Sequence, residues 1–116
     1  MSLHDRACYE DFIRGFKAAT VSEQWEARVA KVGGKVFCLL GNDSGALVFK
    51  VSDLAFDGLV ELPGIGQAAY FAKRRWVRVE PVALAEDLLK GYICQSYQVI
   101  AAKLTRRLQA ELGISV

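Results

Sequence analysis

One stretch of the chain combines positive charge with aromatic rings. Between Tyr70 and Val79 the sequence places four cationic and three aromatic side chains within ten residues. Lysine and arginine bind backbone phosphates, and exposed aromatic rings stack on bases, so this composition favours a surface that contacts nucleic acid. A solvated strand edge is the alternative interpretation, because cationic edges also prevent sheet-to-sheet aggregation.

Seven residues are the candidate nucleic-acid contacts. The cations would bind phosphates, while Tyr70 or Trp76 would supply a stacking platform; Trp76 is equally compatible with a core position. The net charge is only +2, so we expect weak, poorly selective and salt-sensitive binding to DNA or another polyanion. The candidates are Lys50, Tyr70, Lys73, Arg74, Arg75, Trp76 and Arg78. Further cations cluster over residues 28–35 and 103–107.

Catalytic and metal-binding patterns are weak by comparison. His4 is the single histidine, and no serine or cysteine has a histidine in a plausible partner position. The one adjacent carboxylate pair, Glu86-Asp87, lies where a helix is expected to begin, and the helix dipole already accounts for it. We therefore predict no enzymatic activity, no metal site and no cofactor.

Cysteine usage bears on the cellular compartment. Cys8, Cys38 and Cys94 are odd in number, widely spaced and without a CxxC pair. This pattern is typical of reduced, mostly buried thiols in a cytoplasmic protein. No apolar run reaches the roughly 20 residues of a transmembrane helix, so we expect no membrane association.

The segment from Gly64 to Ala69 formally matches the GxGxxA phosphate-binding pattern. Such a site requires a turn that leaves a strand and opens a helix. Here the segment follows an expected helix and leads into the basic-aromatic stretch. We interpret it as a loop after a helix end.

The periodicity predicts a single α+β domain over residues 1–116. We expect a first helix over 5–19, with Asp5 at its N-cap, and then three strands of an antiparallel meander, joined by the Gly33-Gly34 turn and the turn over 41–45. Ser52-Asp53 can cap a second helix, and residues 75–80 alternate as a strand with Trp76 on one face. The last third is helical, with a bend possible near Gly91. The predicted ranges are strands 25–31, 35–40, 46–51 and 75–80, and helices 54–62 and 83–112.

Several short motifs together resemble the MmcQ/YjbR family of small bacterial proteins. The similarity covers roughly residues 23–104, and each motif alone is short. In order, they are Lys35-Val36-Phe37, Val48-Phe49-Lys50, Pro63-Gly64-Ile65, Lys73-x-x-Trp76-Val77 and Ser96-Tyr97.

The resemblance implies a CyaY-like (frataxin-like) α+β fold, in which an antiparallel sheet packs against N-terminal and C-terminal helices. It also implies a DNA-binding role without catalysis. The family usually has His-Leu-Asn-Lys before the tryptophan, whereas this chain has Tyr70-Phe71-Ala72-Lys73. A family function that needs the two polar groups is therefore not implied for this chain.

The leading hypothesis is a small, non-enzymatic DNA-binding protein. A protein-interaction module or homodimer, using the sheet face or the aromatic edge, is the first alternative. A small-anion-binding protein or enzyme is the second, and it requires Lys50 and Lys73 to converge on one pocket.

Overall fold

The computed structural model describes residues 2–115, which form a sheet and four helices. The strands are β1 (Thr20–Gln24), β2 (Ala27–Val32), β3 (Lys35–Gly41), β4 (Leu47–Lys50), β5 (Ile65–Gln67) and β6 (Trp76–Val79). The helices are α1 (Arg6–Arg14), α2 (Asp53–Leu59), α3 (Glu86–Ala102) and α4 (Arg106–Leu112).

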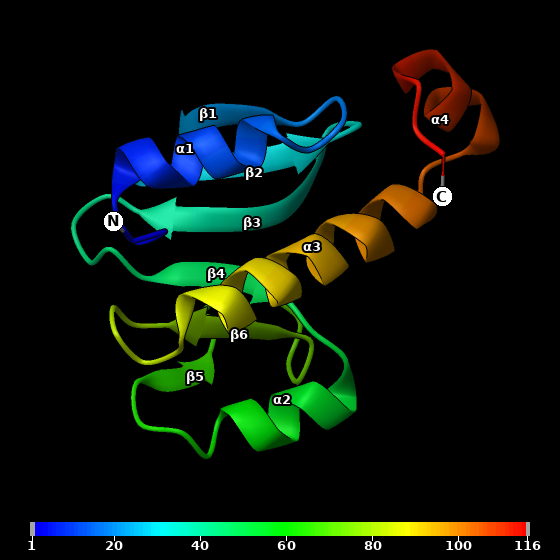
Figure 1. The fold of residues 1–116 in the computed structure, drawn as a ribbon. Coiled ribbons are helices and arrows are strands. Elements are labelled where there is room, and N and C mark those ends of the chain that lie inside the picture. Colours follow the sequence, from blue (N-terminus) through cyan, green and yellow to red (C-terminus); the bar gives the residue numbers. More distant parts are fainter. Residues whose placement is uncertain (1, 116) are drawn as a thin grey trace.

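The six strands form one sheet in the order β1-β2-β3-β4-β6-β5, and every neighbouring pair is antiparallel. The chain makes a meander from β1 to β4, passes through α2, forms the edge strand β5 and returns as β6 beside β4 (Figure 1). The predicted α+β class, with an antiparallel sheet and helices at both ends of the chain, is confirmed.

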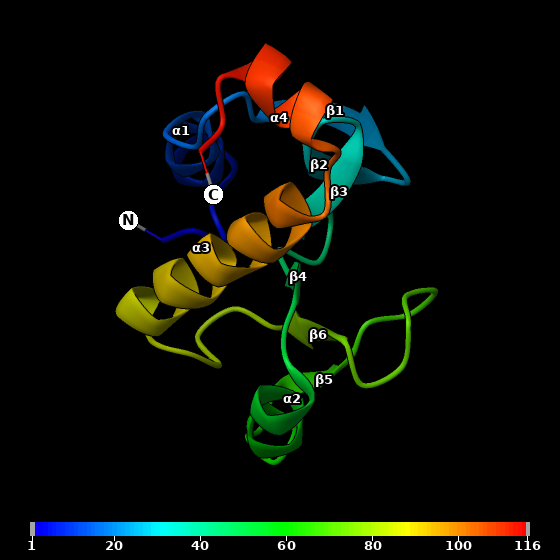
Figure 2. The same ribbon diagram turned by 90° about the vertical axis from the view of Figure 1, so that its right-hand side faces the viewer.

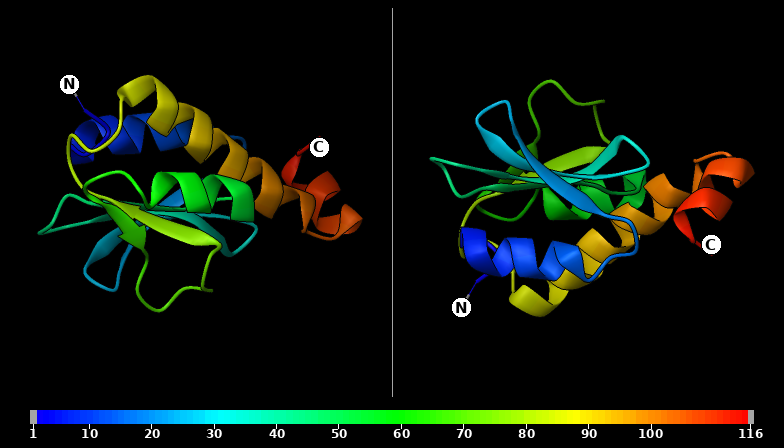
Figure 3. Two further views of the ribbon diagram at one scale, coloured as in Figure 1. Left: turned by 90° about the horizontal axis from the view of Figure 1, so that it is seen from below. Right: turned by 90° about the horizontal axis from the view of Figure 1, so that it is seen from above.

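The helices lie on one side of the sheet only. Figures 2 and 3 show α1, α2 and α3 against the same face, with α4 beyond the end of α3. The β1–β2 hairpin and the loop over residues 68–75 project on the opposite side (Figure 3). One sheet face is thus covered by helices, whereas the other is bordered by two loops; we call the latter the open face.

Both edge strands were missed by the sequence analysis. The residues of β1 are largely polar and mostly exposed, so they show no hydrophobic alternation. β5 has only three residues, one of them Gly66, and it replaces the loop that we expected after α2. Trp25 and Glu26 are not strand residues as predicted: they form the tight turn between β1 and β2, with φ of 53° and 56°.

The helix boundaries also differ from the expectations. α1 ends at Arg14, five residues early, and Asp5 occupies the N-cap position without a side-chain cap bond. The predicted helix over 83–112 is two helices, because the chain leaves α3 at Lys103 and restarts when Thr105 caps α4. Gly91 lies inside α3 and does not interrupt it. By contrast, Ser52 caps α2 as predicted, accepting a bond from the amide of Ala55.

Apolar residues divide between the two faces. The main core lies between the sheet and the helices, around Tyr9, Phe37, Phe49 and Ile93, all fully buried. A small second cluster of Val48, Ala68 and Trp76 lies apart from it, with Val36, Leu39 and Phe71 packed around it. Because β-strand side chains alternate between faces, Val48 and Phe49 lie on opposite sides.

Ser96 of α3 joins the helix layer to the sheet. Its hydroxyl donates to the carbonyl of Phe37 in β3 (2.6 Å) and accepts from the amide of Lys50 in β4 (3.0 Å). Registered pairing between these strands covers only Cys38–Leu40 and Leu47–Phe49, so the two backbone groups lie just beyond it. The side chain thus completes the ladder where the strands separate. In the sequence, Ser96 is notable only as part of the Ser96-Tyr97 motif.

We predict that Ser96→Ala lowers the free energy of unfolding by about 2–4 kcal/mol, because two backbone groups in a largely buried position lose their partner. Urea denaturation would measure the change. Ser22→Ala is the matched control: Ser22 is exposed in β1, and we expect a change below about 0.5 kcal/mol. Equal stability of the two variants would contradict the bridging role.

Candidate functional site

The loop over residues 68–75 is held in one conformation by the side chain of Gln67. Its amide nitrogen donates to the carbonyl of Ala68 (2.8 Å), with longer contacts to the carbonyls of Phe71 and Ala72 (both 3.4 Å). Its carbonyl oxygen accepts from the amide of Arg74 (2.9 Å). The segment that matches GxGxxA, Gly64 to Ala69, therefore contains the edge strand β5 and the glutamine that holds the loop in place. No sequence pattern indicated this role for Gln67.

The two aromatic candidates of this loop differ in accessibility. Trp76 is 8% exposed, and its ring packs against Phe71 with a centroid separation of 4.5 Å. It belongs to the small cluster on the open face and has little surface for stacking on a base. Tyr70 is fully exposed. Of the two rings predicted as a stacking platform, that of Tyr70 is the accessible one.

Carboxylates partly neutralise three of the candidate arginines. Arg74 pairs with Asp57 (3.0 Å) and Arg75 with Asp53 (3.3 Å), both on α2. Arg78 pairs with Glu80 (2.6 Å). Exposed ion pairs are weak and exchangeable, but these three reduce the positive potential of the loop and of β6. The loop is thus less strongly cationic than its sequence indicates.

A different group of cations converges on one pocket of about 560 Å³. Lys50 at the end of β4 meets Arg75 before β6 and Lys103 at the end of α3. The rest of the lining is neutral: Val51, Ser52, Gln95 and Val99. We call this the Lys50 pocket.

The composition of the Lys50 pocket differs from the expected one. Lys73 is not among its lining residues, so the Lys50–Lys73 pairing that a small-anion site required is replaced by Lys50 and Lys103. The two lysines are 53 positions apart in the sequence, and no local pattern connects them.

The electrostatics of the Lys50 pocket are unfavourable without a ligand. Close approach of the Lys103 amine, followed by burial and by the charges of Lys103 and Arg75, lowers the pKa of Lys50 from 10.5 to about 8. No carboxylate is part of the lining, although Asp53 pairs with Arg75 from outside it. An anion in this pocket would relieve the repulsion between the two lysines.

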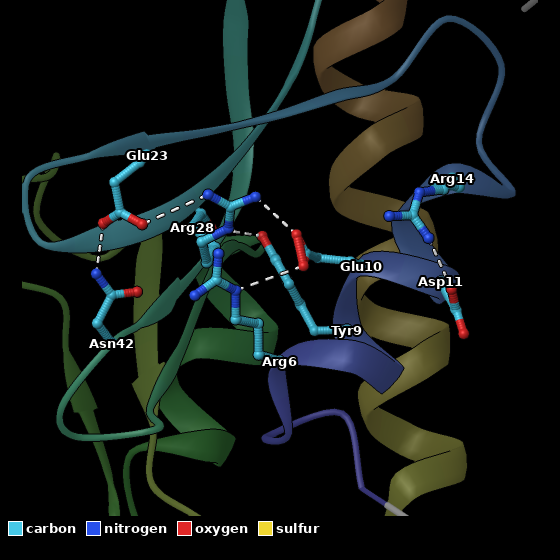
Figure 4. Close-up of polar contacts among 8 residues, drawn as sticks. All are labelled: Arg6, Tyr9, Glu10, Asp11, Arg14, Glu23, Arg28 and Asn42. Carbon is cyan, nitrogen blue, oxygen red and sulfur yellow. Dashed lines mark hydrogen bonds and ion pairs between the residues drawn. The ribbon is translucent and has the colours of Figure 1, made fainter.

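Arg28 does not belong to the surface cluster of cations that the sequence predicts over residues 28–35. Arg28 is largely buried and bridges α1 and β1, bonding Glu10 (2.6 Å) and Glu23 (3.4 Å) (Figure 4). The hydrogen bond from Arg28 holds the pKa of the Glu10 carboxyl below its ordinary value. The hydroxyl of Tyr9 donates to the carbonyl of Arg28 (2.9 Å), so the network anchors α1 to the sheet. Arg28 is therefore a structural residue, not a surface cation.

A pocket of about 630 Å³ lies on the open face. The apolar side chains of Leu39 and Val48 lie among its lining, which extends from the β1–β2 turn to the loop over 68–75. We call it the sheet groove. Its aromatic lining residues are Trp25, Tyr70 and Phe71, and its charged ones are Glu26, Asp43 and Arg78.

Other chemistry has little support among residues 2–115. Their His, Cys, Asp and Glu side chains form no group of three or more that could hold a metal ion. Burial raises the pKa of the Cys38 thiol to about 12, which disfavours the reactive thiolate. Of the helices described here, none has the length and apolar character needed to cross a membrane.

A protein-family model named YjbR matches residues 14–99 of the sequence. The chain belongs to the YjbR family. The resemblance that we found from short motifs is confirmed, including the span that contains Lys50, the loop over 68–75 and Ser96. No curated protein is similar to this YjbR-family chain in sequence.

Two solved structures share the fold of this YjbR-family protein. Deinococcus radiodurans protein DR2400, described as a DUF419 domain, superposes with a TM-score of 0.81 and 20% identity over 92% of this chain and 86% of its own. A protein from Pseudomonas syringae superposes with a TM-score of 0.68 and 18% identity over 83% of this chain and 98% of its own. At these identities the similarity establishes the fold.

We predict that Lys50 titrates near pH 8 and that Lys103→Gln raises its pKa toward 10.5, because the neighbouring charge is removed. The lowered pKa destabilises the folded state fully below about pH 8, and the penalty disappears as the pH rises toward 10.5. Below pH 8, Lys103→Gln should therefore be more stable than the unmodified protein. NMR titration of the lysine 13Cε resonances measures the pKa, and urea denaturation at pH 7 and pH 10 measures the stability.

The control for this titration is Lys90→Gln, which removes an exposed lysine of α3 that does not line the pocket. It should leave the Lys50 titration unchanged. A Lys50 pKa that stays near 10.5 in the unmodified protein would contradict the proximity of the two amines.

Proposed function

We propose that this YjbR-family protein is a non-enzymatic, cytoplasmic binding protein for phosphate-bearing polyanions, DNA above all. The contact is centred on the Lys50 pocket, with a backbone phosphate near Lys50, Lys103 and Arg75. The observation that carries the proposal is the convergence of these three cations on a pocket without a carboxylate in its lining.

Phosphate is the anion that suits this pocket best. Lysine binds phosphate as a point charge, and arginine adds several N–H donors in a fixed plane. Two mutually repelling lysines gain more from an anion than isolated surface lysines do. Arg75 has a competing carboxylate in Asp53, so its contribution depends on exchange of an exposed ion pair.

The loop over 68–75 contributes secondary contacts in this proposal. Lys73 and Tyr70 are exposed, whereas Arg74 and Arg78 already pair with Asp57 and Glu80, carboxylates that compete with a phosphate. Trp76 acts mainly by supporting Phe71 and the loop. Binding should be weak and should depend little on base sequence, because it relies on phosphates.

The test is fluorescence anisotropy with a labelled oligonucleotide, single-stranded and as a duplex, at two salt concentrations. We expect measurable binding at low salt and a steep loss at high salt. Lys50→Gln and Lys103→Gln should each weaken binding and reduce the log–log salt slope by about one, as expected for one lost phosphate contact. Lys90→Gln is the matched control and should bind within about twofold of the unmodified protein.

Inorganic pyrophosphate provides the small-anion arm of the same experiment. If pyrophosphate shifts the Lys50 resonances to a saturating limit while neither oligonucleotide binds at low salt, the ligand is a small phosphate compound. The DNA proposal then fails. If the Lys50 and Lys103 variants bind DNA like the unmodified protein, the site is wrong.

A protein-interaction module or homodimer is the second candidate, and an apolar groove between α2 and α3 favours it. The groove of about 380 Å³ is lined entirely by apolar residues and a tyrosine. Leu54 is 85% exposed and Leu88 is 53% exposed, and both line this groove. Exposed apolar residues that share one surface, unlike scattered ones, mark interaction sites. A second copy of the chain could bury both leucines.

We predict that, if this face self-associates, sedimentation velocity shows a concentration-dependent dimer that Leu54→Lys or Leu88→Lys abolishes. Val82→Lys is the control, since Val82 is 98% exposed but does not line the groove. A strict monomer at every concentration would exclude the homodimer.

A further inference from the structure

The sheet groove is separate from the Lys50 pocket, and the two share no lining residue. Its volume of about 630 Å³ falls in the range of small-molecule sites, which are typically lined by apolar and aromatic groups with a few convergent polar ones. DNA binding at the Lys50 pocket leaves the groove unexplained.

Two exposed aromatic rings border the groove from separate loops. Trp25 is 67% exposed in the β1–β2 turn, and Tyr70 is fully exposed in the loop over 68–75. Figure 3 shows that the hairpin and the loop project on the same side of the sheet. Exposed rings contribute little to the fold, so packing does not account for their presence.

Both aromatic residues also have an unfavourable backbone conformation. Trp25 and Tyr70 have φ of 53° and 68°, the left-handed region that favours glycine or asparagine. Trp25 and Glu26 occupy the two central positions of a tight hairpin turn where Asn-Gly is typical. Bulky rings are thus placed where smaller residues would be more stable, and strain of this kind clusters at ligand sites.

Arg78 gives the groove a positive group beside its apolar residues. It lies between Val48 of β4 and Gly66 of β5 in the strand register, and a Cβ on Gly66 would meet no atom within 4 Å. Gly66 has no side chain that could cover Arg78, and the space beside it is open. Glu80 accepts one of its five N–H donors, which leaves others for a ligand.

We propose that the sheet groove binds a small planar aromatic compound that carries an anionic group. The ring contacts Trp25, Tyr70 and the apolar residues Leu39 and Val48, and the anionic group meets Arg78. The carboxylates of Glu26 and Asp43 lie in turns at the groove's border. Because these two carboxylates would attract a cation, a cationic aromatic compound is the probe that tests the charge of the ligand.

The test uses 2-naphthoate as the probe, with 2-naphthylmethylammonium as the cationic arm and 2-naphthylmethanol as the neutral arm. Binding is followed by NMR shift changes of the Trp25 indole and the Arg78 amide. We expect naphthoate to bind most tightly. Arg78→Gln should reduce naphthoate binding to the level of the alcohol while leaving the alcohol unaffected.

Glycine substitutions separate binding from folding. Trp25→Gly and Tyr70→Gly each remove a ring and relieve a left-handed φ, so we expect a thermal midpoint at least as high as that of the unmodified protein together with about tenfold weaker naphthoate binding. Val82→Gly is the matched control, because Val82 is also exposed with φ of 61° but does not line the groove. It should raise the midpoint and leave binding unchanged.

The proposal is overturned if no probe binds at its solubility limit, if the cationic probe binds more tightly than naphthoate, or if Trp25→Gly and Tyr70→Gly bind like the unmodified protein. Trp25→Gly separates these outcomes from DNA binding, because Trp25 lines the sheet groove and has no part in the proposed DNA contact. All of the variants also leave Lys50, Arg75 and Lys103 in place.

Discussion

The pair of hydrogen bonds made by Ser96 is the contact on which much of the remaining structure depends. It joins α3 to the carbonyl of Phe37 and the amide of Lys50 where β3 and β4 separate. Because the hydroxyl must reach both strands, α3 has little freedom to slide or rotate on the sheet. Residues one and two turns further along the helix are then fixed with respect to the end of β4.

The Lys50 pocket is a consequence of this arrangement. Gln95 and Val99 of α3 and its C-cap residue Lys103 are spaced four residues apart, so they follow one side of the helix and line the pocket together. The contact that fixes Ser96 on the amide of Lys50 thereby also brings Lys103 to the Lys50 side chain. The repulsion between two amines is maintained by the fold rather than relieved by it, as is common at binding sites.

The one-sided helix layer explains the other candidate site. With α1, α2 and α3 on one face, no helix lies over the apolar cluster of the opposite face (Figure 3). There Phe71 packs against Trp76 within the cluster, beside the loop that Gln67 holds. The remaining surface between this loop and the β1–β2 turn is the sheet groove. The same loop positions Tyr70 at the groove and precedes Arg75 at the Lys50 pocket, so one segment serves both sites.

The sequence by itself determined the class of fold, the family, the central strands, the α2 cap at Ser52 and the presence of cations around residues 70–78. These features follow from local periodicity, turn residues and short motifs. β1 and β5 could not be found in this way, because edge strands take their order from a neighbouring strand rather than from their own hydrophobic pattern. The break after α3 was equally hidden, since the apolar spacing continues through it.

Only the tertiary structure decided which cations act together. The sequence grouped Lys73, Arg74, Arg75 and Arg78 by proximity along the chain, whereas the fold pairs three of them with carboxylates and brings Lys50 and Lys103 into contact with one pocket. The physical reason is that charge interactions depend on distance in space. That distance was set by the docking of α3 through Ser96 and by the conformation of the loop through Gln67.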